Sequence, residues 1–219
     1  MLQNLPGEIF KAYDIRGIVG RTLTAGVVEA IGHAIGSEAA ARGQSAIAIG
    51  RDGRLSGPEL IAALARGIQK SGIDVIDVGC VPTPMVYFAA HHLRTRCAVM
   101  LTGSHNPPDY NGLKMVLADE TLSGETIQQL RQRIELSDLT HGTGSYSQQD
   151  ISADYIARIV SGIRLARPMK VTVDCGNGVA GAYVAGLYRQ LGCEVEEMYC
   201  EVDGHFPNHH PDPSQPENL

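Results

Sequence analysis

The stretch SAIAIGRDGRLSGPELIAALARGIQKSGIDVIDVG, residues 45–79, decides the fold class. Its first six residues alternate small and branched side chains, which predicts a strand that ends at the charged turn RDGR, residues 51–54. A helix follows, because apolar residues recur at helical spacing and Gly72 suits a helix end. Residues 74–79 read as a second strand. The order strand, helix, strand predicts an α/β fold, with a mixed, mostly parallel sheet flanked by helices in three layers.

The start of that helix carries its own signal. Ser56 and Glu59 form the S-x-x-E pattern of a capping box, and Pro58 stands in the first turn. We therefore expect the Ser56 side chain to cap the helix.

The same alternation extends in both directions along the chain. A helix is expected to begin near Thr24, and the apolar run 97–101 predicts a strand buried on both faces. Residues 111–116 read as a short strand, followed by a helix that carries Ile127, Leu130 and Ile134.

A polar stretch, SDLTHGTGSYSQQ at residues 137–149, predicts a domain boundary. We place one domain at residues 1–150 and part of a second at residues 151–219. The second part reads as a helix, a strand at 170–173, the turn DCGNG, a helix and a final strand at 193–199. One strand–helix–strand unit cannot easily cover both faces of its sheet, so we expect this domain to be incomplete.

The composition of the chain excludes some classes of function. The chain has 219 residues, of which 43% are hydrophobic and 19% charged, so a folded globular protein is expected. The formal net charge of -6 argues against binding nucleic acid through bulk charge. No apolar run is long enough for a membrane span, and no signal peptide is visible. Five scattered cysteines without a C-x-x-C motif indicate reduced thiols, and we expect a cytoplasmic protein.

The strongest chemical signal is TGSHNPP, residues 102–108, directly after the buried strand. In parallel sheets, loops beyond the carboxyl ends of strands are where ligands bind, so the Ser104 hydroxyl is a candidate reactive group. The same residue types also make ordinary surface turns. Three basic segments favour the functional interpretation: Arg16 near the N-terminus, the turn 51–54, and Lys114. Cations around a serine suit phosphoryl transfer, where positioning and charge neutralisation supply most of the catalysis.

Five motifs together resemble the α-D-phosphohexomutase superfamily, and the bacterial phosphomannomutase/phosphoglucomutase branch in particular. They are FKAYDIRG, GRDGR, TGSHNPPDYNGLK, DCGNGVAG and DGHFPNHHPDP, in order along the whole chain. The serine motif is highly specific, whereas GRDGR alone is weak. The chain thus resembles the first domain and part of the second domain of such an enzyme.

The resemblance implies an isomerase that interconverts hexose 1-phosphate and hexose 6-phosphate of mannose or glucose. Ser104 carries the phosphoryl group, and a 1,6-bisphosphate intermediate turns over in the site. The matching positions place His105, Arg16, Tyr13, Asn106 and Lys114 around the reacting group, with Lys114 as candidate acid or base. Arg16, Tyr13, Asn106 and Lys114 are also the expected substrate-binding residues.

The resemblance further implies Mg²⁺, with phosphorylated Ser104 as one ligand, and glucose 1,6-bisphosphate as activator. The family's aspartate loop D-G-D-x-D-R does not occur in this sequence, so we expect no stable magnesium site and no turnover by this chain alone. The family pattern implies a monomer at full length, whereas this part of it could self-associate through an exposed apolar patch. A phosphoglucosamine mutase is the alternative within the class.

Other patterns compete with this interpretation. Gly176, Gly178 and Gly181 spell G-x-G-x-x-G after a strand, with Glu201 about 20 residues on, as in dinucleotide-binding domains. A non-catalytic module that binds sugar phosphate or nucleotide therefore stays open. A zinc site at Cys200 and the histidines that follow fits no familiar spacing. A serine hydrolase lacks the G-x-S-x-G elbow.

Overall fold

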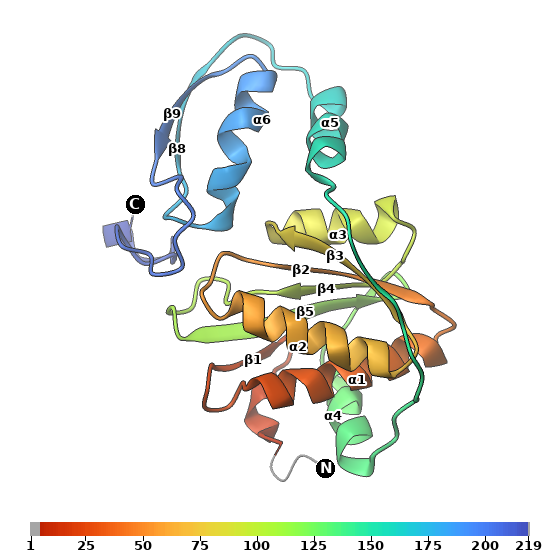
Figure 1. The fold of residues 1–219 in the computed structure, drawn as a ribbon. Helices are drawn as coiled ribbons and strands as arrows, with labels where there is room; N and C mark the ends of the chain where they lie inside the picture. The colour runs from red at the N-terminus through yellow and green to blue at the C-terminus, as the bar shows by residue number, and fades with distance from the viewer. Residues whose placement is uncertain (1–4, 219) are drawn as a thin grey trace.

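The computed structural model describes residues 5–218 (Figure 1). Its first part is built on one seven-stranded sheet. The strands are β1 (Ile15–Ile18), β2 (Ala46–Arg51), β3 (Asp74–Cys80), β4 (Ala98–Leu101), β5 (Tyr110–Leu117), β6 (Glu120–Thr121) and β7 (Tyr146–Gln148). The helices of this part are α1 (Ala25–Ala41), α2 (Gly57–Lys70), α3 (Thr83–His92) and α4 (Glu125–Leu136), after a 3-10 turn at Gly7–Ile9.

The sheet is mixed, in the order β1-β5-β4-β2-β3-β7, with β6 beside β5. Strands β4, β2, β3 and β7 run parallel to one another, whereas β5 is antiparallel to β4, β1 and β6. The carboxyl ends of β2 and β4 therefore meet at one edge, and the serine motif follows β4 there. The predicted α/β class with a mixed sheet is confirmed.

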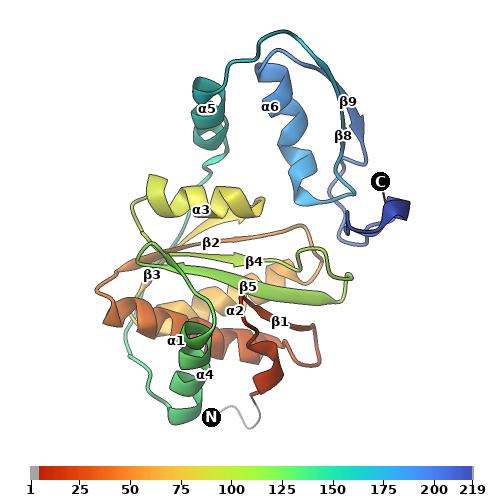
Figure 2. The same ribbon diagram turned by 180° about the vertical axis from the view of Figure 1, so that it is seen from behind.

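Helices cover both faces of this sheet, as Figures 1 and 2 show. Alternate residues of β2 belong to different cores: Ile47 and Ile49 pack with α1, α2 and α4, whereas Ala48 packs with α3. This alternation is what a strand with helices on both faces requires. Helices α1 and α2 approach closely at Gly67, where a Cβ would lie only 2.1 Å from the Glu29 carbonyl oxygen. Glycine permits this approach.

Two local expectations were wrong. Ser56 makes no side-chain cap; its Oγ accepts a hydrogen bond from Asn111 Nδ2 at 2.9 Å instead. The segment YDIRG, residues 13–17, was expected to form a loop, but Arg16 lies in strand β1, paired with Gly112 of β5.

The polar stretch 137–149 also contains a strand that its pattern did not predict. Strand β7 is exposed along its whole length and pairs in parallel with β3. Ser145 and Tyr146 fix it by donating hydrogen bonds to Asp74 and Asp77, at 2.8 and 2.7 Å. Backbone pairing and carboxylates, rather than apolar burial, hold this edge strand in place.

The second part of the chain has two parallel strands, β8 (Lys170–Asp174) and β9 (Glu194–Met198). They accompany α5 (Ser152–Gly162), a 3-10 turn at Val179–Ala182, α6 (Val184–Gln190) and a last 3-10 turn at Pro216–Asn218. In both views this part lies on the side of the sheet that α3 covers. Several of its large apolar side chains are exposed: Ile163, Met169, Met198, Tyr199 and Val202. Self-association through them stays a prediction.

Within residues 5–218, no helix is both long and apolar enough to cross a membrane.

Candidate functional site

The serine loop, residues 102–110, follows β4 at the edge where β2 also ends. Ser104 has a φ of 53°, a left-handed conformation that costs energy in any residue with a side chain. Its amide donates a hydrogen bond to Thr102 Oγ1 at 2.9 Å, and Thr102 Oγ1 in turn donates to Asp52 Oδ2 at 2.8 Å. The loop is thus held in a conformation that its own sequence does not favour.

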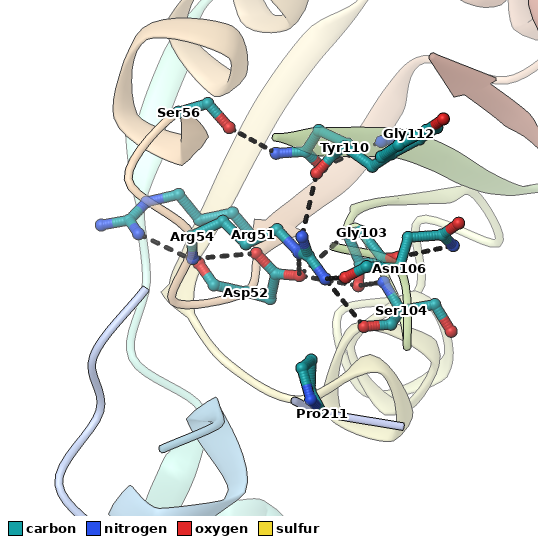
Figure 3. Close-up of polar contacts among 12 residues, drawn as sticks. Arg51, Asp52, Arg54, Ser56, Gly103, Ser104, Asn106, Tyr110, Gly112 and Pro211 are labelled. Atoms are coloured by element: carbon teal, nitrogen blue, oxygen red, sulfur yellow. Dashed lines mark hydrogen bonds and ion pairs between the residues drawn. The ribbon is translucent and has the colours of Figure 1, made fainter. Parts of the chain in front are cut away.

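Arg54 is the centre of the contacts that hold this loop (Figure 3). Its side chain is only 1% exposed, and its guanidinium forms an ion pair with Asp52 at 3.3 Å. It donates to four carbonyl oxygens of the loop: those of Ser104 (2.9 Å), Asn106 (2.7 Å), Pro107 (2.5 Å) and Tyr110 (3.1 Å). Burial lowers the pKa of Arg54 from its usual value, and the neighbouring Asp52 carboxylate opposes that shift. An arginine remains a cation under such conditions.

Gly103 leaves the space that Arg54 occupies. A Cβ at this position would lie 2.0 Å from Cζ and Nε of the guanidinium. Its amide donates to Asp52 Oδ2 at 3.0 Å. The glycine of the motif is therefore required by the close approach of a buried cation.

The second part of the chain contacts the same loop through residues 200–213, the C-terminal loop. The Phe206 ring lies 5.3 Å from the guanidinium carbon of Arg54. A Cβ at Gly204 would lie 2.8 Å from the Gly53 carbonyl oxygen, so the two backbones are in contact. His105 Nδ1 lies 2.7 Å from the Pro211 carbonyl oxygen, which makes that nitrogen the protonated one.

A cavity of about 580 Å³ lies between these two parts. Ser104, His105 and Asp52 line it from the first part. The turn 174–180 and the C-terminal loop line it from the second part. The volume is in the range of small-molecule sites. The structure thus brings Ser104 and His105 together at a cavity large enough for a sugar phosphate.

Arg16 and Lys114 form a separate cationic group on the neighbouring strands. Arg16 Nη1 donates to the Thr102 carbonyl oxygen at 2.8 Å, and its other terminal nitrogen pairs with Asp14 at 2.5 Å. Lys114 Nζ lies 4.0 Å from the same carboxylate, and Lys114 pairs with Met100 of β4. Both cations therefore lie beside the strand that delivers Ser104, although neither lines the cavity.

Two more of the predicted substrate-binding residues do not line the cavity. Tyr13 is 80% exposed and does not line the cavity. Asn106 Nδ2 donates to the Gly103 carbonyl oxygen at 3.0 Å, so this side chain is used within the serine loop. Conversely, the turn 51–54 was expected to supply a cation near the serine, but neither Asp52 nor Arg54 was singled out as a residue that holds the serine loop. The GRDGR motif was the available signal, but nothing in the sequence shows that Arg54 points into the serine loop.

The described residues alone do not fit the magnesium ion that the family resemblance implies. Nowhere in residues 5–218 do three His, Cys, Asp or Glu side chains cluster as metal ligands. The carboxylate of Asp52, beside Ser104, already accepts hydrogen bonds from Thr102 and Gly103 and pairs with Arg54.

The backbone amides of the glycine-rich turn after β8 already have hydrogen-bond partners within the chain. The amides of Gly176, Asn177 and Gly178 donate to Asp174 Oδ1 and to the carbonyls of Tyr199 and Cys175, at 2.7–2.8 Å. The 3-10 turn and the seven-residue helix α6 follow. In dinucleotide-binding domains such amides face the pyrophosphate instead.

Comparisons with known proteins agree with the resemblance. Residues 7–141 match the family model "Phosphoglucomutase/phosphomannomutase, alpha/beta/alpha domain I", and residues 153–219 match domain II of the same family. A phosphomannomutase/phosphoglucomutase of Pseudomonas aeruginosa is 60% identical over 98% of this chain and 46% of its own length. A phosphoglucomutase of Neisseria meningitidis is 54% identical over 100% of this chain and 48% of its own length.

A solved structure leads to the same family. The crystal structure of a phosphoglucomutase/phosphomannomutase family protein from Burkholderia thailandensis is 52% identical and superposes with a TM-score of 0.96. The match covers 99% of this chain and 49% of that one. The chain thus spans about half the length of the relatives it matches. These matches show that the chain belongs to the phosphoglucomutase/phosphomannomutase family.

Proposed function

We propose that this chain carries the phosphoryl-accepting serine of a phosphohexomutase, an isomerase that interconverts hexose 1-phosphate and hexose 6-phosphate. The observation that carries the proposal is the Ser104 loop: a strained serine lining a cavity of about 580 Å³, held there by a buried arginine. Phosphoryl transfer depends mainly on positioning and on stabilising charge, and a preorganised loop supplies the positioning.

The proposed chemistry moves one phosphoryl group between two oxygens. A hydroxyl of the hexose phosphate attacks the phosphorus of phosphorylated Ser104, so a sugar oxygen–phosphorus bond forms and the Ser104 Oγ–phosphorus bond breaks. The product is a hexose 1,6-bisphosphate. After the sugar turns over, Ser104 Oγ attacks the other phosphate and the remaining monophosphate leaves. No net phosphate is gained or lost in the cycle.

The neighbouring side chains have proposed roles in this cycle. Lys114 accepts the proton of the attacking hydroxyl and returns it to the leaving oxygen, as a general acid and base does. Arg16, beside β4, offsets the negative charge that gathers during transfer. His105 lies at the cavity wall, where its imidazole can contact the phosphoryl group. Tyr13 and Asn106 contribute to substrate binding.

The substrate class follows from the relatives. They are named for phosphomannomutase and phosphoglucomutase activity, so mannose and glucose phosphates are the proposed substrates. No contact among the described residues favours glucosamine phosphate over these sugars. Glucose 1,6-bisphosphate is the proposed compound that loads the serine.

Mass spectrometry tests the proposal directly. The purified chain is incubated with glucose 1,6-bisphosphate, and its peptides are then mapped. We expect one added phosphate on Ser104, which is lost in Ser104→Ala. The control Ser161→Ala removes an exposed hydroxyl that donates only within α5, and it should load like the wild type. A phosphate that maps to another residue, or that persists in Ser104→Ala, would contradict the assignment.

A further inference from the structure

Two cysteines outside the proposed reaction lie in contact with each other. The Sγ atoms of Cys175 and Cys200 are 3.4 Å apart, and both residues are free thiols. Cys175 directly follows β8, and Cys200 stands two residues after β9. Because β8 and β9 are parallel neighbours, their carboxyl ends bring the two thiols together.

Both thiols can be reached from solvent, unlike two other cysteines of the chain. Cys175 and Cys200 are half-buried, and Cys175 lines the cavity described above. Cys97 and Cys193 are buried. Burial, followed by the hydrogen bond with Cys200, raises the pKa of Cys175 to about 12. Burial disfavours the Cys175 thiolate, so we assign Cys200 as the sulfur that reacts first.

We propose that Cys175 and Cys200 form a redox modification site, a dithiol that a peroxide oxidises to a disulfide. The Cys200 sulfur attacks one peroxide oxygen, which gives a sulfenic acid and one water. The Cys175 sulfur then attacks the Cys200 sulfur, a sulfur–sulfur bond forms, and the hydroxyl leaves as a second water after taking the Cys175 proton. A low-molecular-weight dithiol reverses the reaction by thiol–disulfide exchange.

The contacts around the pair indicate what this bond does. Asn177, two residues after Cys175, donates through Nδ2 to the Glu201 carbonyl at 2.9 Å. Its own carbonyl accepts from the Asp203 amide at 3.0 Å, and its Oδ1 accepts from Asn208 at 2.8 Å. The turn after β8 and the C-terminal loop are thus already joined at several points. A disulfide adds a covalent link in the same arrangement, so oxidation tightens the loop rather than breaking its contacts.

The C-terminal loop in turn contacts the serine loop. Phe206 lies over Arg54, and the Pro211 carbonyl lies 2.7 Å from His105 Nδ1. Oxidation of the pair therefore restrains the wall of the cavity that faces Ser104. The proposal requires only the thiols and this packing, so it can be tested without any mutase activity.

Peptide mapping of the chain, oxidised with hydrogen peroxide and then alkylated, tests the bond. With alkylation in denaturant, where buried thiols also react, we expect the number of alkylated cysteines to fall from five to three. A linked peptide pair containing Cys175 and Cys200 should form and should disappear after treatment with dithiothreitol. Cys175→Ser and Cys200→Ser should each abolish it, whereas the matched control Cys80→Ser should keep it. If both cysteines are alkylated after oxidation, or are found only as sulfinic acids, the redox site is disproved.

Hydrogen exchange tests the consequence. In the oxidised chain, the amides of residues 201–211 should exchange more slowly than in the reduced chain, and the difference should vanish in Cys200→Ser. Unchanged or faster exchange in this segment would overturn the inference that the bond tightens the C-terminal loop. Neither measurement depends on Ser104, so failure of the proposed function and failure of this proposal are distinguishable.

Discussion

The guanidinium carbon of Arg54 lies 5.3 Å from the centre of the Phe206 ring, so one buried side chain joins the serine loop to the C-terminal loop. Arg54 donates to the serine loop on one side and lies under an aromatic ring on the other. A cation over an aromatic face is attracted by the ring's quadrupole, most strongly where water is excluded. The two parts of the chain that line the cavity are therefore not independent of each other.

Replacing Arg54 tests how much its contacts contribute to the stability of the folded chain. Arg54→Ala removes the cation that pairs with the Asp52 carboxylate and the donor to four loop carbonyls. Breaking a buried ion pair in this way costs about 3–5 kcal/mol. We expect a loss of that size in the free energy of unfolding, measured with urea.

The matched control is Arg66→Ala. Arg66 is half-exposed on α2 and pairs with Glu29 at 3.1 Å. A surface ion pair contributes about 1 kcal/mol or less. Equal losses in the two variants would show that Arg54 does not hold the loop as its contacts indicate.

Gly103→Ala tests the space beside the guanidinium. The added methyl would lie 2.0 Å from Arg54 Cζ, so the loop or the arginine must shift. Overpacking of this kind costs about 1–3 kcal/mol. We expect a lower urea midpoint and faster hydrogen exchange in residues 104–110.

Gly186→Ala in α6 is the control, because a Cβ there meets nothing within 4 Å. It should raise stability by about 0.5–1 kcal/mol, since alanine suits a helix better than glycine. A neutral Gly103→Ala would mean that the close approach to Arg54 is absent in solution.

The parts of this structure that the sequence predicted are those governed by local patterns. The alternation of Ile47 and Ile49 placed β2, and Gly72, with a φ of 85°, ends α2 as expected. Ser56 has the pattern of a helix cap, but its hydroxyl is bound by Asn111, which is 55 residues away. A local sequence pattern cannot predict a hydrogen-bond partner that is so distant along the chain.

The same reason explains what was missed at the site. Ser104 and His105 stand in a motif specific enough to be singled out, and both line the cavity. Arg54 was expected to be one of several cations facing a ligand. Its carbonyl partners lie 50–56 residues away, and only the folded chain shows that it points at backbone rather than at solvent. Strand β7 was missed because it is exposed, so it has no apolar alternation.

His209 should make stability depend on pH. Its Nδ1 lies 2.9 Å from the His210 carbonyl oxygen, and its Nε2 lies 3.1 Å from Asp174 Oδ1. The hydrogen bond with the His210 carbonyl, followed by that with Asp174, raises the pKa of His209. The folded chain therefore binds this proton more tightly than the unfolded chain does. The resulting stabilisation is complete below the ordinary histidine pKa of about 6.5 and is lost as the pH rises through the raised pKa.

Urea unfolding of the wild type and of His209→Gln at a series of pH values measures this effect. We expect the wild type to exceed His209→Gln in free energy of unfolding by the largest amount at about pH 6. At about pH 9 the difference should be much smaller. Asp174→Asn should weaken the pH dependence without removing the imidazole. An advantage that grows with pH would show that His209 binds its partners in the neutral form.

Lys114 offers the sharpest test of the proposed chemistry. If it moves the proton of the reacting hydroxyl, Lys114→Met should slow the loading of Ser104 by glucose 1,6-bisphosphate by about 100-fold or more. A time course of phosphate on Ser104, followed by mass spectrometry, measures the rate. The control Lys11→Met, at an exposed position that does not line the cavity, should load like the wild type.

A second substitution separates proton transfer from simple charge. Lys114→Arg keeps a cation near Asp14, but a guanidinium does not give up its proton near neutral pH. If Lys114 acts as acid and base, this variant should be as slow as Lys114→Met. If it loads at nearly the wild-type rate, then Lys114 serves only to offset charge. In that case the proton must pass to a different group, and His105, which lines the cavity with Nδ1 held at the Pro211 carbonyl and Nε2 left to accept, becomes the residue to replace next.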